Sequence, residues 1–198
     1  MRAAARGAGR RISSPSVSDM RIATLSGSLQ ERSSNTALVR AAREVAPDGV
    51  ELVVFRSLAD VPWLDPSLEP EPVQELRELI GEADGVLIAS PEHGHSMPGV
   101  LKNALDWLVG SGELSGLPVA LMSASPTMGG GIRAQMALTQ TLLAQAALIP
   151  VTLTVPAIKS KLDENGELAD QATRRRIRET LVALAEAVEE RRAYLQAS

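Results

Sequence analysis

Five short apolar runs alternate with five segments whose apolar residues recur at helical spacing, and this alternation restricts the fold more than any other feature. The apolar runs are expected to be strands at 21–25, 50–55, 85–89, 117–122 and 151–155. The helical segments are expected at 35–45, 73–80, 100–109, 132–148 and 170–196. Strands and helices that alternate in this way form a parallel sheet through right-handed crossovers. The sequence therefore predicts an α/β protein whose doubly wound, five-stranded parallel sheet has helices on both faces.

The composition excludes several classes of protein. The chain has 198 residues, of which 44% are apolar, and it contains no cysteine, so a disulfide scaffold, a cysteine-ligated metal and a cysteine nucleophile are all excluded. A formal net charge of −4 argues against a nucleic-acid partner. No run approaches the roughly 18 apolar residues of a membrane span. We expect a protein of the reducing cytoplasm, with neither nucleic acid nor membrane as its partner.

Residues 1–19 differ in composition from the rest of the chain. Four arginines against one aspartate give this segment a net charge of +3, and it has almost no large apolar side chain. We expect a disordered basic tail, followed by a single domain at 20–198. The arginines also allow a transit peptide, and Met20 is an alternative natural start. A signal peptide is not expected because an apolar segment is missing.

The first strand is followed by a polar loop of residues 26–35, here called loop one, which leads into the first helix. In open α/β sheets, ligands bind beyond the carboxyl ends of the strands. The hydroxyl and amide side chains of this loop, with the free N–H groups of a helix N-terminus, suit a single phosphate dianion. Neither a dinucleotide fingerprint nor a Walker loop is present. The alternative interpretation is that Ser33 or Ser34 merely caps the helix.

A second polar loop, residues 90–98 or loop three, follows the third strand. Pro91 and Pro98 stiffen its backbone, and the glycines at 94 and 99 permit close approach. Such a loop is suited to presenting main-chain N–H and C=O groups to a flat heterocycle.

Three motifs, two that begin in these loops and one after the fourth strand, carry a family resemblance. G-S-L-x-x-x-S-x-N occurs at 27–35, S-P-E-H-G-x-S-M-P-G-V-L-K-N-A-L-D-W at 90–107, and G-G-x-R at 130–133. Together they resemble the NADPH-dependent FMN reductase family, flavodoxin-like flavoproteins that include quinone and azo-dye reductases. The matches extend from Arg21 to about Gln145. The resemblance implies a flavodoxin-like sheet of strand order 2-1-3-4-5.

The resemblance also implies which residues bind FMN. Loop one would surround the phosphate with Ser28, Gln30, Ser33 and Asn35, together with their neighbours Ser26, Leu29, Arg32 and Ser34. The family usually has arginine where this chain has Gln30, so we hypothesise that Arg32 supplies the cation. The pyrimidine edge of the isoalloxazine would lie along Pro91, Glu92, His93 and Gly94. Ser123 and Ser125 are further candidate contacts to the ribityl chain or the ring.

Other polar residues near these loops have simpler interpretations. His93 and His95 are the only histidines and have no evident further ligands, so no metal site is expected. The glycine triplet at 129–131 is interpreted as a flexible rim that admits substrate. Arg133 is a candidate either for an NADPH phosphate contact or for a salt bridge between subunits.

The function implied by the resemblance is hydride transfer through FMN. NADPH or NADH would be the donor, and a quinone, azo compound, free flavin or similar small molecule the acceptor, in a ping-pong sequence. No side chain is expected to be catalytic, because the flavin carries the chemistry. The family also implies a homodimer or homotetramer, with Met97 and Trp107 as expected interface residues and core positions as the alternative for both. The alternatives are a flavodoxin-type electron carrier and a flavin-binding sensor or interaction module without turnover.

Overall fold

A computed structural model describes residues 20–198, which form a parallel five-stranded sheet of order β2-β1-β3-β4-β5. This is the strand order that the sequence predicts. The expected basic tail at 1–19 lies outside the described residues. The strands are β1 (Met20–Ser26), β2 (Val50–Val54), β3 (Gly85–Ala89), β4 (Pro118–Ala124) and β5 (Leu148–Val155).

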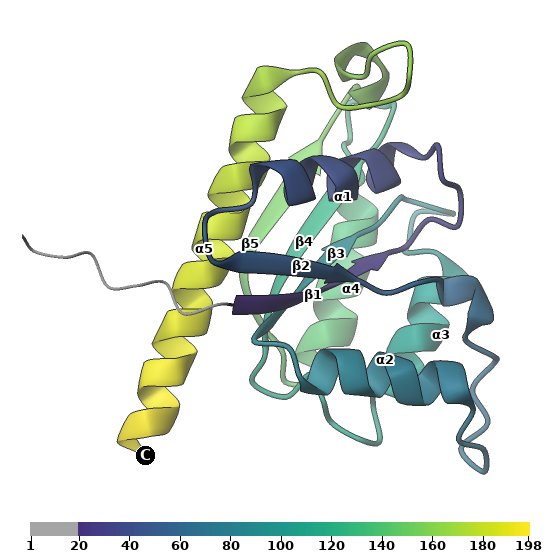
Figure 1. Ribbon diagram of the computed structural model, residues 1–198. Coiled ribbons are helices and arrows are strands. Elements are labelled where there is room, and N and C mark those ends of the chain that lie inside the picture. The colour runs from purple at the N-terminus through teal and green to yellow at the C-terminus, as the bar shows by residue number, and fades with distance from the viewer. Residues whose placement is uncertain (1–19) are drawn as a thin grey trace, which may run out of the picture.

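Five α-helices cover the two faces of the sheet (Figure 1). On one face lie α1 (Ser34–Val45) and α5 (Gln171–Ala197). On the other face lie α2 (Glu71–Gly81), α3 (Gly99–Trp107) and α4 (Ile132–Leu143). Two 3₁₀ turns, η1 (Leu58–Asp60) and η2 (Ile158–Lys161), lie in the connections after β2 and β5.

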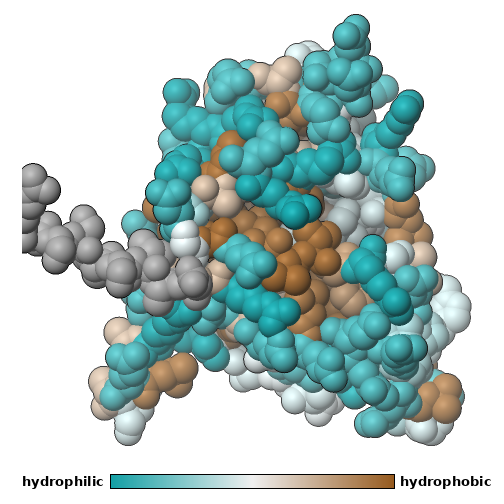
Figure 2. Space-filling model, viewed as in Figure 1, coloured by the Kyte–Doolittle hydropathy of each residue, from teal (hydrophilic) through white to brown (hydrophobic). Residues whose placement is uncertain are grey.

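The central strands are buried on both sides. Every residue of β3 and β4 is buried, so these strands are nearly continuous apolar runs, as expected when helices cover both faces of a parallel sheet. In the edge strand β2 only Leu52 is buried, and the other residues are half-buried or exposed. β2 faces the viewer in Figure 1, and Figure 2 shows an apolar area at this position between hydrophilic rims.

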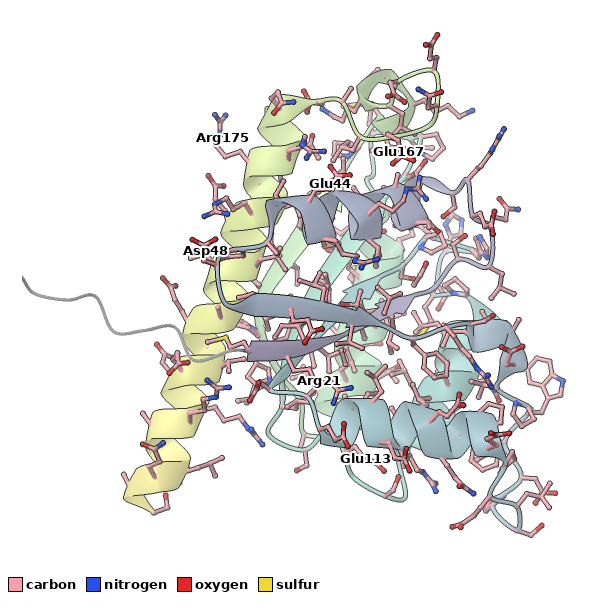
Figure 3. The ribbon with its side chains drawn as sticks, viewed as in Figure 1. Arg21, Glu44, Asp48, Glu113, Glu167 and Arg175 are labelled. Carbon is pink, nitrogen blue, oxygen red and sulfur yellow. The ribbon has the colours of Figure 1, made fainter. Side chains whose placement is uncertain are left out.

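Ion pairs tie α5 and the preceding connection to α1. Arg174 of α5 lies 2.7 Å from Glu44, and Arg40 lies 2.8 Å from Glu167. Figure 3 shows both carboxylates on this side of the molecule. α5 begins at its N-cap Asp170, whose side chain accepts from the Thr173 N–H. These contacts fix the last helix over the face that α1 covers.

The boundary between α4 and β5 differs from the prediction. The helix ends at Leu143 rather than at residue 148, and β5 begins at Leu148 rather than at residue 151. Ala146 adopts a left-handed conformation with φ of 58° and so turns the chain into the strand. Helix-favouring alanines and apolar residues continue across this turn, and sequence periodicity therefore gave no stop signal.

Two expected interface residues are buried within the chain. Trp107 is 2% exposed, and its indole N–H donates to the Pro62 carbonyl at 2.8 Å, while Met97 is 8% exposed. Asn103 of the same helix is also buried and holds the same connection through Leu64 and Pro62. Trp107 and Met97 thus belong to the core of the chain, as the core alternative expected. A homodimer interface along this helix stays a prediction.

Candidate active site

A cleft of about 540 Å³ lies at the carboxyl edge of the sheet, between loop one and loop three. Its volume falls within the usual range for small-molecule sites. Loop one leaves β1 toward the right of Figure 1 and turns back into α1. The walls consist of Gly27, Ser28, Leu29, Gln30, Arg32, Ser33, Ser34, Asn35, Pro91, Glu92, His93, Pro98, Gly99, Val100, Ala124, Ser125 and Pro126.

Most of the predicted site residues line this cleft, and three do not. Ser26, Gly94 and Ser123 are absent from its walls. The residues that sequence reasoning missed include Pro98, Gly99 and Val100, which begin α3. In the sequence, Pro98 and Gly99 were assigned only to the backbone shape of loop three, because the family resemblance placed the ring contacts at residues 91–94.

Loop one is shaped by serine hydroxyls and by one close packing contact. Ser33 is the N-cap of α1, and its Oγ accepts from the Thr36 N–H at 3.0 Å. A Cβ at Gly27 would lie 3.0 Å from the Oγ of Ser90, so this glycine lets loop one approach the start of loop three. The capping interpretation of Ser33 is thus correct, and it leaves the N–H groups of the first turn pointing out of the helix.

Several main-chain donors of loop one have no protein acceptor among the described residues. They are the N–H groups of Leu29, Glu31, Arg32, Ser34 and Asn35. The last two belong to the N-terminus of α1, where the helix dipole adds partial positive charge. The exposed Arg32 side chain also forms no ion pair or hydrogen bond with any described residue. This combination of donors and charge suits an anion.

Asn35 has a different role from the other polar residues of loop one. It is 2% exposed, its Nδ2 donates to the Ala124 carbonyl at 3.1 Å, and its Oδ1 accepts from the Ala124 N–H at 2.9 Å. Both ends of the amide are therefore occupied by β4. The side chain joins α1 to β4, and only the main-chain N–H of Asn35 remains for a ligand.

Loop three contains a tight two-residue turn at Gly94 and His95. The N–H groups of His93 and Ser96 each donate to the other residue's carbonyl at 2.9 Å. Gly94 and His95 between them have φ of 55° and 63°, the pattern of a type I′ turn. A left-handed histidine costs roughly 1 kcal/mol. This turn holds Pro91, Glu92 and His93 along one wall of the cleft.

The base of loop three is attached to β4 and to the start of α4. The buried Ser123 Oγ donates to the Ser90 carbonyl at 2.6 Å. Gly131, the left-handed N-cap of α4, packs on Ser123 so closely that a Cβ would overlap its Oγ. Gly130 is similarly packed against Thr154. The expected flexible rim is therefore wrong for these two glycines, which are buried and close-packed.

Glu92 connects loop three to α4. Its carboxylate accepts from the Arg133 N–H at 3.1 Å, from Arg133 Nη1 at 3.2 Å and from His95 Nδ1 at 3.4 Å. Partial desolvation raises the pKa of Glu92, but the hydrogen bonds from Arg133 and His95 and the charge of Arg133 together outweigh it. The net pKa of Glu92 is lower than that of a free carboxyl. Arg133 is thus engaged by its own chain, a partner that neither sequence-based alternative included.

Within residues 20–198, no three histidine, aspartate or glutamate side chains are grouped so that they could hold a metal ion. In the same part of the chain, no helix combines the length and apolar character needed to cross a membrane.

Known proteins similar in sequence place the chain in a family. Residues 20–160 match the family model described as NADPH-dependent FMN reductase. The chain is 34% identical over 183 residues to the quinone reductase of Escherichia coli, covering 86% of this chain and 96% of that protein. It is 34% identical to an NAD(P)H-dependent FMN reductase of Pseudomonas aeruginosa, covering 84% and 94%.

A solved structure extends the comparison. The flavoenzyme FerB of Paracoccus denitrificans, an NAD(P)H:acceptor oxidoreductase, superposes with a TM-score of 0.75 and 26% identity, covering 87% of this chain and 98% of FerB. A flavodoxin from Pseudomonas aeruginosa superposes with a TM-score of 0.57 at 14% identity, which supports the flavodoxin-like fold alone.

Proposed function

The chain belongs to the NADPH-dependent FMN reductase family, and on this premise we propose that its cleft binds FMN and serves NAD(P)H-dependent reduction of a quinone or a similar small acceptor. The observation that carries the proposal is the set of unpaired N–H groups in loop one, at one end of a cleft large enough for a mononucleotide. We further propose that residues 20–198 act as one FMN-binding domain.

The phosphate end of the cleft fits a dianion by its chemistry. Ser34 and Asn35 supply helix N-terminal N–H groups, and Leu29 and Arg32 supply further main-chain donors. Such donors must otherwise be satisfied by water, and a bound phosphate replaces several waters at once. We propose that these groups, with the Ser28 and Ser34 hydroxyls, hold the FMN phosphate.

The ring end of the cleft fits a flat heterocycle. Pro91 and His93 are held by the type I′ turn, and Pro98 and Val100 add apolar surface at the start of α3. A rigid wall of main-chain groups beside apolar side chains can both recognise polar ring edges and exclude water. We propose that loop three meets the pyrimidine edge of the ring.

The mechanism follows from these placements. FMN, when bound, supplies the hydride-accepting and hydride-donating chemistry of the reaction. The donors of loop one would anchor the phosphate, and the main chain of loop three would orient the ring. Donor and acceptor would enter the same cleft in turn, so ping-pong kinetics are expected. No side chain of the cleft is required as an acid or base in this scheme.

Arg32 is the proposed cation for the phosphate, because Gln30 occupies the position where relatives usually have arginine. Replacing Arg32 with alanine should weaken FMN binding by about tenfold, the equivalent of roughly 1.4 kcal/mol for a charge-assisted hydrogen bond. Arg32→Lys should recover most of this loss. Fluorescence titration of the flavin-free protein measures both variants, and unchanged affinity in Arg32→Ala would exclude this role.

The decisive experiment is the absorption spectrum of the purified protein. Yellow protein should release FMN on denaturation, bleach with NADPH under anaerobic conditions and regain its colour on addition of a simple quinone. Bleaching that is reversed only by a redox protein would indicate an electron carrier. Flavin binding without bleaching would indicate a sensor. The homodimer or homotetramer and the cytoplasmic location stay predictions.

A further inference from the structure

The N-terminus of α4 is capped from outside the helix. Its own N-cap residue, Gly131, offers no side-chain hydrogen bond, and its first turn contains no acidic residue. The carboxylate of Glu92 occupies this position instead and accepts from the N–H of Arg133, in the first turn of α4. A carboxylate at a helix N-terminus is stabilised by the unpaired N–H groups and by the helix dipole.

The same carboxylate is neutralised by a side chain of α4. Arg133 Nη1 lies 3.2 Å from Glu92 Oε1, while the Glu92 side chain is only 18% exposed and the Arg133 side chain is 59% exposed. Glu92 therefore faces the protein side of the contact, and Arg133 covers it from solvent. His95 adds a longer contact from within loop three, at 3.4 Å.

Glu92 also lies between Pro91 and His93, the two residues of loop three proposed to contact the flavin ring. Pro91 precedes it and His93 follows it, and all three line the cleft. The backbone on one side is fixed by the Ser123–Ser90 hydrogen bond, and on the other side by the 93–96 turn. The side chain of Glu92 adds a third attachment point, to an element that itself packs on Ser123 through Gly131.

We propose that Glu92 is a positioning residue for the flavin: its carboxylate, shared between the α4 N-terminus and Arg133, fixes the main chain of 91–93 and balances the charge of Arg133, which contacts this wall of the cleft through Glu92. This inference rests on the proposed function. It predicts that the two partners act on a bound flavin in opposite directions, because each single substitution leaves the other charge without its counter-ion near the cleft.

The first experiment needs no flavin. Glu92→Gln, Arg133→Met and the double variant are unfolded with urea as flavin-free proteins. Each single variant should raise the unfolding equilibrium constant by about fivefold, and the double variant should add little to either. Independent, additive effects would show that the two side chains are not coupled and would overturn the proposal.

The second experiment reads the charge balance with FMN bound. Glu92→Gln removes the negative charge, so the flavin midpoint potential should rise and the KM for NADPH should fall. Arg133→Met should shift both quantities the opposite way. The expected change in KM is about fivefold in each direction, the upper range for one partly exposed ion pair. Shifts of the same sign in both variants would indicate a merely structural contact and would overturn the proposal.

A matched control lies at the opposite end of the sheet. Asp84 also accepts from a main-chain N–H and from a guanidinium, those of Arg21 and Arg192. Asp84→Asn should destabilise the protein without moving the flavin potential or the KM. If Glu92→Gln folds poorly, Glu92→Asp keeps the charge with a shorter reach. It should then restore the potential toward that of the wild type, and no restoration would count against the proposal.

The two proposals fail in distinguishable ways. A wild-type protein that binds no FMN would overturn the proposed function and with it the positioning role. The urea experiment would still report whether Glu92 and Arg133 are coupled. Normal flavin binding with additive unfolding effects would overturn only the positioning role.

Discussion

At each end of the sheet, a carboxylate accepts from a main-chain N–H and pairs with a guanidinium, but only the pair at the carboxyl end lies beside the cleft. At the amino end, the carboxylate of Asp84 accepts from the Arg21 N–H at 2.9 Å and lies 2.8 Å from the Arg192 guanidinium. At the carboxyl end, Glu92 makes the corresponding pair of contacts with Arg133. The side chain of Arg21, labelled in Figure 3, adds an ion pair with Glu82 at the amino end.

The surroundings of the two carboxylates differ because of the sheet topology. In a parallel sheet with helical crossovers, each helix N-terminus points to the carboxyl edge of the strands. α1, α3 and α4 therefore all present N–H groups to the side that holds the cleft. Glu92 accepts from one such group at α4, the Arg133 N–H, whereas the N–H groups of Ser34 and Asn35 at α1 have no acceptor within the described residues. The candidate site thus contains donors that the fold leaves unpaired.

Gly131→Ala should have the largest effect of the variants that follow. The added Cβ would overlap Ser123 Oγ, and the backbone φ of 85° disfavours any side chain. We expect a loss of about 3 kcal/mol in unfolding free energy and weaker FMN binding. Gly166→Ala is the control, because its φ is 80° but nothing lies within 4 Å of a Cβ. It should cost about 1 kcal/mol and leave FMN affinity unchanged.

Urea denaturation and flavin titration measure both glycine variants. Equal losses in Gly131→Ala and Gly166→Ala would mean that the close packing against Ser123 contributes nothing. The packing at the carboxyl end of the sheet would then contribute no more to stability than the packing at the surface turn of Gly166.

Ser123→Ala should have the next largest effect. It removes a buried 2.6 Å hydrogen bond and leaves the Ser90 carbonyl without this donor. We expect a loss of about 2 kcal/mol and weaker FMN binding, because loop three is released at its base. Thr180→Val is the control, since its hydroxyl donates to Arg176 inside α5, away from the cleft. Unaltered FMN affinity in Ser123→Ala would mean that the Ser123–Ser90 hydrogen bond does not contribute to FMN binding.

Asp84→Asn tests the amino end of the sheet. The change removes the charge that faces Arg192 while keeping an acceptor for the Arg21 N–H. Because both side chains are partly exposed, we expect a loss of about 1 kcal/mol in urea denaturation. The visible flavin spectrum should be unchanged. A spectral shift would show that the two ends are coupled through the strands.

Asp170→Asn should have the smallest effect, and that effect depends on pH. Hydrogen bonds from the Thr173 side chain and N–H, and then the Lys161 contacts, lower the pKa of Asp170. A lowered folded-state pKa stabilises the protein above the unfolded pKa of about 3.9, and this stabilisation is lost as the pH falls through the folded-state value. The free energy of unfolding should fall more steeply below about pH 4 in the wild type than in Asp170→Asn. The same dependence of unfolding free energy on pH in the wild type and in Asp170→Asn would contradict this prediction.

The sequence predicted the strands and the loops of the site because both depend on local patterns. Apolar runs between polar loops identify buried parallel strands, and the strand order followed from the family resemblance. Loop one was recognisable as a candidate anion site because serines precede a helix start. The boundary between α4 and β5 was not, because the helix-favouring alanines at 144, 146 and 147 continue to the start of β5, across the turn at Ala146.

Long-range contacts account for the roles that sequence could not assign. Asn35 is a polar residue at a helix start, yet its amide is satisfied by Ala124, 89 positions away. Trp107 was a candidate for either the core or an interface, and its indole N–H donates to the carbonyl of the distant Pro62. Gly131 packs against Ser123, and Arg133 donates to Glu92. Both contacts likewise join segments that are distant in the sequence.

The sequence by itself determined where the backbone is extended, helical or looped, and which loops carry the polar groups of the site. The tertiary structure alone decided which of those groups are already paired, because hydrogen bonds between distant segments depend on how the elements pack. The unpaired N–H groups of loop one and the shared carboxylate of Glu92 are outcomes of that packing.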